Sequence, residues 1–487
     1  MQNHRFAAID QGTTSTRIAV FDNNGAFQTD CSRMSISHKQ ITPKTGWVEH
    51  DAEEILANIK KCIASCGSVD AIGLCHQGES IVAWNAETGK PIYNAIIWQD
   101  MRTEDVIQKL KQDGREATIK KKTGLPLDPY FSASKMGWIL KNIEGAKELA
   151  EKGKLRIGTM DSYFLDSLTG NFFTDYNSAS RTSLFNIHTL KWDKELCKIF
   201  GVPIHCLAEI KDTVGHFGEV EIDGHSTPVT ASLIDQFAGI YGHGCRNKGD
   251  AKVTLGTGAF VQSLSGNEIY DVGDTGLVPT LCWKFPDEEA VFGLDGGVYN
   301  AASAVNWAKS IGLFSSYSEL EGFSERSAAE RGLMFVPALS GLGCPYWDRT
   351  AAGIWTGLSL ETSKKDMLQS LLEGIAVRTT EVIEAMDNIS PLGGSVNVDG
   401  GLSVNGYFRQ FLADISGKTI ISPVNKEITA FGVAMLARKG LGNDQEIKLE
   451  QKVETTEPRN IDRKNILNKY KIISFFLIYC CYILIAI

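Results

Sequence analysis

The sequence predicts an α/β protein of two similar lobes, and two repeated motifs and the chain length carry that prediction. Residues 6–22, FAAIDQGTTSTRIAVFD, place a turn of small hydroxylated residues between two apolar strands. Residues 252–262, KVTLGTGAFVQ, repeat this order about 240 residues later. A chain of 487 residues is also too long for a single hydrophobic core. We therefore expect two lobes that close on one nucleotide.

The first turn has the composition of a phosphate-binding loop. Gly12 lets the backbone turn tightly and approach a ligand closely. Backbone N–H groups and hydroxyls in such a turn converge on anionic oxygens. The carboxylate of Asp10 and the guanidinium of Arg17 suit the charges of Mg²⁺ and phosphate. An ordinary β-hairpin with a polar tip is the alternative, and the second copy of the motif favours the phosphate loop.

The composition is that of an ordinary globular protein, with 43% hydrophobic and 22% charged residues. A net charge of −9 and the lack of a basic stripe argue against nucleic acid as a partner. The 11 cysteines are scattered without CxxC pairs, and no secretory signal precedes them. We therefore expect reduced thiols, a cytoplasmic protein and no metal site of the Cys/His type.

Strands and helices alternate along the chain, as they do in other α/β proteins. Apolar residues at helical spacing predict helices over residues 52–65 and 134–151. A capping-box pattern predicts the start of a long amphipathic helix over 363–389. Residues 395–401, SVNVDGG, have the pattern of a strand that runs into a glycine pair. Backbone can approach a nucleotide closely at such a pair.

The turn-rich stretch 242–251, GHGCRNKGDA, predicts the boundary between the lobes. We expect an N-terminal lobe with the acceptor site and the first phosphate loop, a C-terminal lobe that binds nucleotide, and a final segment of uncertain role. These three segments cover residues 1–243, 244–445 and 446–487.

The last residues, 472–487, form the apolar run IISFFLIYCCYILIAI behind a polar, lysine-rich segment. A membrane-spanning helix usually needs about 20 apolar residues, with about 17 at the short end. Three interpretations stay open. The run is a C-terminal membrane anchor with positive residues left in the cytosol, an altered gene end, or an apolar strand or helix that packs locally.

Ten motifs in the same order cover residues 6 to about 440 and resemble the FGGY carbohydrate kinases, and within them the glycerol kinases. The resemblance implies two actin-like lobes of the ribonuclease H-like, hexokinase and Hsp70 superfamily around a nucleotide cleft. The motifs are DQGTTSTR (10–17), GWVEHD (46–51), NAIIWQDMRT (94–103), LDPYFSASKMGWILKN (127–142), TDYNSASRTSLFNI (174–187), DQFAGIYGHG (235–244), LGTGAF (255–260), FVPALSGLGCPYWD (335–348), TGLSLETSKKDMLQSLLEGIA (356–376) and VDGGLSVN (398–405).

The resemblance assigns roles in phosphoryl transfer. Asp235 is the catalytic general base, and its place at the end of an apolar run agrees with that role. Asp10 is the second catalytic carboxylate and holds Mg²⁺ through water, because Mg²⁺ dehydrates reluctantly. Family members usually have Gly in place of Ala302 and Gln in place of Asn306. The positions implied in ATP binding are Thr13, Thr14, Ser15, Arg17, Thr257, Gly258, Ala302, Asn306, Gly401 and Asn405.

The acceptor site is where the resemblance weakens. Glycerol kinases read NQRET where this chain reads HQGES, so Gly78 replaces an arginine and His76 replaces an asparagine. Losing a charge-assisted donor weakens glycerol binding by roughly 1.5–3 kcal/mol unless another group fills in. Either His76 compensates, or the vacated volume admits a larger polyol; an ordinary, partly exposed histidine at a strand end is the alternative. The positions implied in acceptor binding are Glu79, Trp98, Tyr130, Asp235, Gln236 and Phe260.

Three functions stay open from the sequence. The first is ATP-dependent phosphorylation of glycerol to sn-glycerol 3-phosphate. The second is the same reaction on another polyol or ketose, such as a tetritol or xylulose. The third is a non-catalytic sensor that binds nucleotide or is tethered to a membrane. For the kinase we expect ATP and Mg²⁺ as cofactors, a small-molecule polyol or sugar as partner, and a homo-oligomer with possible C-terminal membrane contact.

Overall fold

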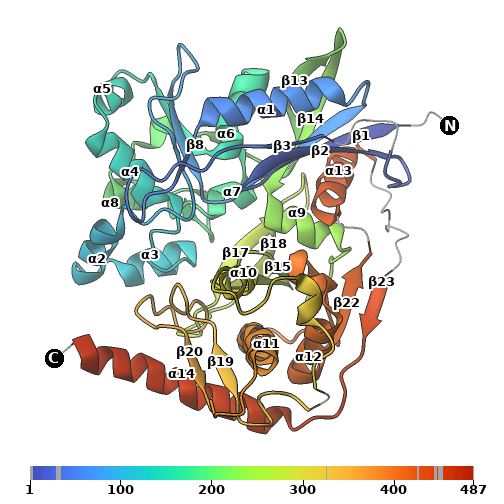
Figure 1. Cartoon of the computed structure of the whole chain (residues 1–487). Coiled ribbons are helices and arrows are strands. Elements are labelled where there is room, and N and C mark those ends of the chain that lie inside the picture. The colour runs from blue at the N-terminus through green and yellow to red at the C-terminus, as the bar shows by residue number, and fades with distance from the viewer. Residues whose placement is uncertain are drawn as a thin grey trace. The chain divides into compact units, whose positions relative to one another are not determined.

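The computed structural model divides the chain into two compact units (Figure 1). It describes residues 4–28, 34–324, 326–424, 427–443, 447 and 453–485, with side chains as far as residue 477. The first unit contains Met1–Gly244, Thr280–Phe292 and Glu427–Glu450; the second contains Cys245–Pro279, Gly293–Lys426 and Gln451–Ile487. The first long segment thus ends within the expected boundary at 242–251, but two later segments return to the first unit.

The first unit is built on a six-stranded sheet with the order β13-β14-β5-β1-β2-β3. Strand β1 pairs antiparallel with β2, as the first motif predicts, and β5 runs parallel to both β1 and β14. The strands are β1 (Arg5–Gln11), β2 (Ser15–Asp22), β3 (Met34–Ser37), β5 (Ala71–His76), β13 (Val214–Ile222) and β14 (His225–Ile234).

Helices cover both faces of this sheet. Helix α1 (Ala52–Ser65), which confirms the predicted helix, shares a buried core with α6 (Met160–Thr169) on one face. On the other face, α13 (Ile428–Gly440) contacts β1, β5 and β14 and packs against α9 (Asp235–Gly242) (Figure 1). Gly73 allows this approach, since a Cβ atom there would lie 2.5 Å from the carbonyl oxygen of Val433.

A four-stranded sheet of order β4-β7-β6-β8 supports the rest of the first unit. The predicted helix over 134–151 is wrong in extent, because the chain there forms two helices. Ile143 is extended and Gly145 has a φ of 78°, which ends helical geometry between them. The elements are β4 (Glu49–His50), β6 (Ile81–Asn85), β7 (Ala95–Ile96), α2 (Glu104–Gln112), α3 (Glu116–Thr123), α4 (Ser132–Asn142), α5 (Ala146–Glu151), β8 (Leu155–Thr159), β9 (Phe173–Asp175), α7 (Tyr176–Ser180), β10 (Phe185–Asn186), β11 (Lys191–Trp192), α8 (Lys194–Phe200), η1 (Ile204–Cys206) and β12 (Glu209–Lys211).

The second unit contains most of a seven-stranded sheet, of order β17-β18-β16-β15-β21-β22-β23. The predicted 252–262 hairpin is confirmed as β15 and β16, and the predicted long helix is confirmed as α11, which starts at a capping box of Ser363 and Asp366. The elements are β15 (Ala251–Leu255), β16 (Ala259–Gly266), β17 (Val278–Trp283), β18 (Val291–Val298), α10 (Ala302–Ser310), η2 (Tyr317–Leu320), β19 (Met334–Val336), β20 (Ile354–Thr356), α11 (Lys364–Ile389), β21 (Ser395–Asp399), η3 (Gly401–Val404), α12 (Gly406–Ser416), β22 (Thr419–Pro423), β23 (Val453–Thr456) and α14 (Arg463–Ile485).

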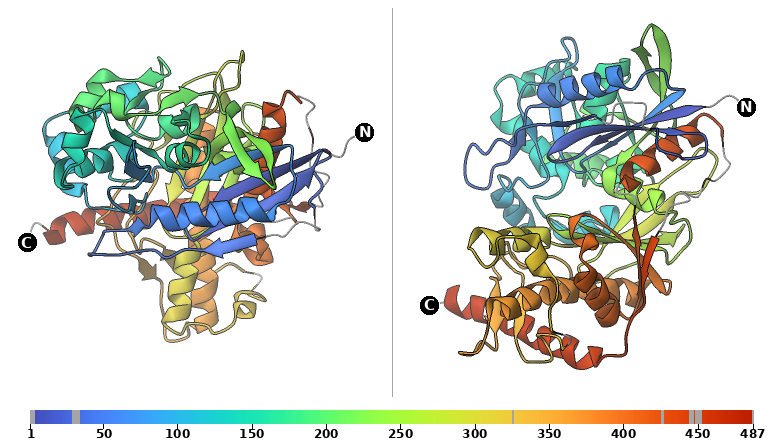
Figure 2. Two further views of the ribbon diagram at one scale, coloured as in Figure 1. Left: turned by 90° about the horizontal axis from the view of Figure 1, so that it is seen from above. Right: turned by 45° about the vertical axis from the view of Figure 1, so that its right-hand side comes forward.

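The C-terminal segment is part of the second unit. Helix α14 contacts α12 and β19, and Figure 2 shows it in red along the orange elements of this unit. Its residues Ile466, Leu467 and Tyr470 are buried in the same core as α11. The first half of the helix therefore packs locally. Over the residues that the structure describes, no helix is long and apolar enough to cross a membrane.

The packing of α14 predicts a difference between its two faces. Leu467→Ala should lower the free energy of unfolding by about 2–5 kcal/mol, because it removes a buried side chain. Phe476→Ala is the matched control, since that ring is 62% exposed and its loss should change stability by less than about 0.5 kcal/mol. Urea denaturation of both variants measures the difference. Equal losses would contradict the packing of α14 on the core.

Candidate active site

Three neighbouring strands of the first unit end at the same edge of its sheet. Strands β14, β5 and β1 lie side by side and run parallel, so their carboxyl ends meet at one edge. Asp10 lies near the end of β1, His76 is the last residue of β5, and Asp235 follows directly on β14 as the first residue of α9. Active-site groups collect at such edges in α/β proteins.

Cys75 lies near both predicted catalytic carboxylates. It is paired with Asp10 across β1 and β5, and its thiol donates to Asp10 Oδ1 at 3.6 Å. Burial raises the pKa of the Cys75 thiol well above its usual range, and the negative charges of Asp10 and Asp235 raise it further. Burial also raises the pKa of Asp10, and the positive charge of Arg17 partly offsets this rise. The sheet edge therefore concentrates negative charge that a cation can neutralise.

Hydrogen bonds fix the backbone and one side chain of the first turn, while other side chains of the turn are exposed to solvent. The Gly12 N–H donates to the Ser15 carbonyl oxygen at 3.0 Å, which closes the turn. Trp98 Nε1 donates to Thr13 Oγ1 at 3.1 Å, and His38 Nε2 donates to the Thr13 carbonyl oxygen at 3.0 Å. Thr14 and Arg17 are exposed. This arrangement suits a loop that receives an anion, and all four predicted phosphate contacts at 13–17 belong to it.

Glu79, Trp98 and Tyr130 form one cluster. Glu79 comes three residues after β5 with a φ of 58°, and the Trp98 and Tyr130 rings pack edge to face at 5.9 Å. The cluster includes Arg181, which the sequence interpretation missed. Its Nε donates to Glu79 Oε1 at 2.6 Å, and its guanidinium lies 5.9 Å from the Tyr130 ring. Arg181 stands within the motif at 174–187, which is the signal that could have indicated it.

The short helix α7 links the pieces of this cluster. Asp175 caps it by accepting from the Asn177 and Ser178 N–H groups, and burial raises the pKa of Asp175 to about 7. The Ile234 N–H donates to Asn177 Oδ1 at 3.0 Å. His76 Nε2 lies 2.8 Å from Ser178 Oγ. The strand ends of β5 and β14 are thus both fixed to one helix.

His76 is not the partly exposed histidine of the alternative interpretation, because it is fully buried. Its Nδ1 donates to the Gln77 carbonyl oxygen at 2.9 Å, and its Nε2 lies 3.5 Å from Asp161 Oδ1 as well as close to Ser178. These contacts, all within the first unit, join β5 to α6 and α7. His76 therefore has a structural role, because it connects these three elements.

Gly78 lies close to a neighbouring side chain. A Cβ atom built on Gly78 would lie 3.0 Å from Cγ2 and 3.1 Å from Cδ1 of Ile234. Carbon atoms in optimal contact are about 3.5–4.0 Å apart. Ile234 is 3% exposed and comes directly before Asp235. Ile234 therefore bounds the space next to the Gly78 backbone, and the size of the acceptor that the site admits stays a prediction.

The second turn, residues 256–258, lies between β15 and β16 in the second unit. The start of α10 is bonded to it: Ala302 N–H donates to the Gly256 carbonyl oxygen at 3.0 Å, and Ser303 N–H donates to the Thr257 carbonyl oxygen at 3.1 Å. The helix that carries Ala302 and Asn306 is thereby fixed to the turn that carries Thr257 and Gly258.

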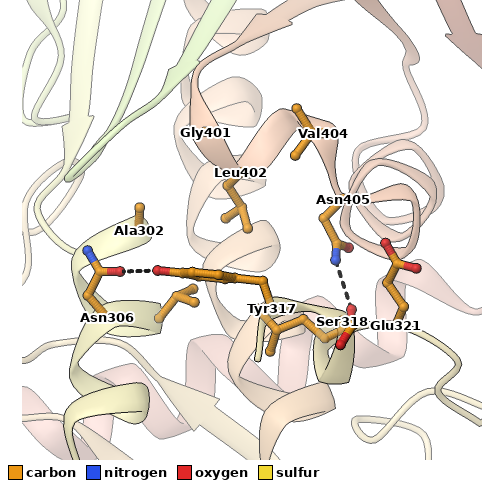
Figure 3. Close-up of a pocket in the computed structure, with 11 residues that line it drawn as sticks. Ala302, Asn306, Tyr317, Ser318, Glu321, Gly401, Leu402, Val404 and Asn405 are labelled. Atoms are coloured by element: carbon orange, nitrogen blue, oxygen red, sulfur yellow. Dashed lines mark hydrogen bonds between the residues drawn. The ribbon is translucent and has the colours of Figure 1, made fainter. Parts of the chain in front are cut away.

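A cavity of about 490 Å³ opens beside this helix, within the second unit (Figure 3). Four predicted nucleotide contacts line it, at positions 302, 306, 401 and 405. The ring of Tyr317 spans part of it, and its hydroxyl donates to Asn306 Oδ1 at 3.1 Å. The sequence interpretation missed Tyr317. The full lining is Ala302, Val305, Asn306, Tyr317, Ser318, Leu320, Glu321, Gly401, Leu402, Val404 and Asn405.

The predicted residues therefore fall into two sets, one in each unit. The first unit holds Asp10, the first turn, and the acceptor positions 79, 98, 130, 235 and 236. The second unit holds the second turn, the cavity positions and Phe260, which is on β16 with its ring beside Gly297.

The donors at the sheet edge suit Mg²⁺ that arrives with phosphate. Among the described residues, no group of three or more His, Cys, Asp or Glu side chains could hold a metal ion alone. Mg²⁺ in nucleotide sites commonly needs only one or two carboxylates, because phosphates and water supply the other oxygens. The half-buried carboxylate of Asp10, beside the exposed first turn, fits that requirement.

Comparison with protein families gives matches over most of the chain. The family model for the N-terminal domain of the FGGY family of carbohydrate kinases matches residues 6–242. The model for the C-terminal domain of the same family matches residues 251–440.

Curated relatives and solved structures are similar over nearly their full lengths. A glycerol kinase from Geobacter sp. is 40% identical, covering 89% of this chain and 90% of its own. One from Halothermothrix orenii is 38% identical, covering 95% and 94%. The crystal structure of Plasmodium falciparum glycerol kinase with ADP has a TM-score of 0.88 at 30% identity, covering 96% of each chain. This likeness confirms the predicted α/β fold with two actin-like lobes.

Proposed function

The chain belongs to the FGGY family of carbohydrate kinases, and from this premise we propose that it transfers the γ-phosphoryl group of ATP to a hydroxyl of a small polyol, with glycerol as the first candidate and sn-glycerol 3-phosphate as the product. The relatives named glycerol kinase support this acceptor. The observation that carries the proposal is the shared sheet edge, where Asp10 near the end of β1 and Asp235 directly after β14 lie at the carboxyl ends of the two strands that flank β5. Two carboxylates with separate tasks are what this reaction needs.

Each set of residues has a part in the transfer. Asp235 accepts the proton of the attacking hydroxyl, while Glu79 orients the acceptor by taking a hydrogen bond from a neighbouring hydroxyl. The N–H groups and hydroxyls of the two turns hold phosphate oxygens. Asp10 binds Mg²⁺, which supplies positive charge against the phosphates when bound. The cavity beside α10 holds the adenosine, since its lining is mainly apolar with a few polar groups.

An acceptor assay separates this function from the two alternatives. Purified protein with Mg²⁺–ATP should release ADP fastest with glycerol, and slower with a tetritol or xylulose. Faster release with one of the latter would favour a kinase for another polyol or ketose, to which the HQGES sequence points. Binding of ATP without ADP release for any acceptor would favour a nucleotide sensor.

The adenosine cavity predicts an effect that is confined to the nucleotide. Tyr317→Ala should raise the KM for ATP about 2- to 10-fold, the equivalent of about 0.5–1.5 kcal/mol of ring contact. The KM for the acceptor should stay unchanged. Tyr317→Phe is the matched control, because it keeps the ring and loses only the bond to Asn306. Steady-state kinetics with both substrates varied measures the split. An unchanged KM for ATP in the alanine variant would show that the adenosine does not bind in this cavity.

A further inference from the structure

The side chain of Ile234 forms a fixed wall beside the predicted acceptor residues. Its backbone is bonded to Asn177 on α7 and is paired with His76 on β5. Its side chain meets Gly78, which directly precedes Glu79. The Ile234 side chain thus adjoins the residue that precedes Glu79, and Ile234 itself precedes Asp235, the two residues expected to contact the acceptor. The hydrogen bond of its backbone to Asn177 fixes its position.

Arg181 brings positive charge to Glu79. Its side chain is 3% exposed and that of Glu79 is 5% exposed, so the ion pair between them is almost fully buried. Buried charges are stable only when they are paired and hydrogen-bonded. The 2.6 Å bond from Nε to the Glu79 carboxylate, together with the Tyr130 and Phe131 rings on the guanidinium, fixes the direction of that carboxylate.

We propose, on the basis of the kinase function above, that Ile234 sets the length of the acceptor and that Arg181 positions Glu79 to bind one of its hydroxyls. The site then takes a three-carbon polyol. Longer polyols and ketoses are excluded because their additional carbons meet the Ile234 side chain. A side chain at position 78 would press on this wall, since its Cβ atom would lie 3.0 Å from Cγ2 of Ile234.

Shortening the wall should change the choice of acceptor. Ile234→Ala should raise the ratio of kcat/KM for erythritol over glycerol at least about tenfold, as expected when one or two carbons become admissible. Ile234→Val should raise this ratio less. It is the smaller change, so it still tests the role of the wall if the alanine variant misfolds. Val229→Ala, a buried truncation on the same strand, is the matched control and should leave the ratio unchanged. An unchanged ratio in both Ile234 variants would overturn the role of the wall.

A double-mutant cycle tests the pairing of Gly78 with Ile234. Gly78→Arg alone should lower kcat/KM for glycerol about tenfold or more, because its Cβ meets Ile234. In the Ile234→Ala background the same substitution should cost less than about threefold. Equal costs in the two backgrounds, or a gain from Gly78→Arg alone, would show that Ile234 does not fill this space.

Arg181 is tested through the split between KM and kcat. Arg181→Met should raise the KM for glycerol at least about tenfold while the KM for ATP changes less than about twofold. Arg181→Lys keeps the charge and should recover part of the loss. Equal changes in both KM values, with no recovery by lysine, would indicate a general structural role and overturn the positioning role.

The outcomes separate this inference from the proposed function. If the unaltered protein phosphorylates no polyol, the kinase function itself fails. If it phosphorylates glycerol while the Ile234 and Arg181 variants keep their acceptor preference and KM values, the inference alone fails. Thermal melting of each variant shows whether it is folded at the assay temperature.

Discussion

Replacing Asp235 by Asn is expected to lower kcat by at least about 10², the usual scale for losing a general base. Asparagine keeps the shape of the side chain but cannot accept the proton of the attacking hydroxyl. The Gln236 N–H donates to Asp235 Oδ1 at 2.6 Å. The side-chain oxygen of asparagine can accept the same hydrogen bond, so the start of α9 should be preserved. Stopped and steady-state assays of ADP formation with glycerol measure the loss.

The controls for Asp235→Asn separate chemistry from folding. ATP affinity and the melting temperature should match those of the unaltered protein. Asp113→Asn makes the same chemical change on an exposed carboxylate at the end of α2, where its pairing with Lys109 contributes little. It should keep full activity. If Asp235→Asn retained more than half of the activity, Asp235 would not be the base.

Asp10→Asn should lower activity about 10- to 100-fold and raise the Mg²⁺ concentration needed for half-maximal rate. The amide cannot supply the negative charge that attracts the cation. The stability of the first unit should not fall, because burial raises the pKa of Asp10 and so disfavours its charged form in the folded protein. A magnesium titration of the rate tests this. An unchanged Mg²⁺ requirement with unchanged kcat would exclude Asp10 as the metal-binding carboxylate.

Elements encoded by contiguous residues could be predicted from the sequence. The hairpin of β1 and β2 and that of β15 and β16 each follow from a strand, a small-residue turn and a second strand. The start of α11 follows from Ser363 and Asp366, three residues apart. The predicted helix over 134–151 failed between Ile143 and Gly145, because apolar spacing continues across a break that an extended residue and a left-handed glycine create.

Partners that meet only in the folded chain could not be predicted. Arg181 lies 102 residues from Glu79, and no local pattern links them. Ile234 belongs to an apolar strand run, so its contact with Gly78 has no signature in the sequence. The family resemblance indicated which residues contact substrates, since those recur as motifs. It did not indicate which side chain lies next to Gly78, the position at which glycerol kinases have an arginine.

The position of α13 has a consequence for synthesis of the protein. This helix covers one face of the first unit's sheet, yet it is encoded after the whole of the segment Gly293–Lys426 (Figure 1). A ribosome that has completed Gly244 must add the residues up to Ile428 before that face can be covered, which takes roughly 10–40 s at about 5–20 residues per second. During this interval the apolar side chains of β1, β5 and β14 that α13 will bury are open to chaperones. The first unit therefore cannot finish folding until most of the second unit has been translated.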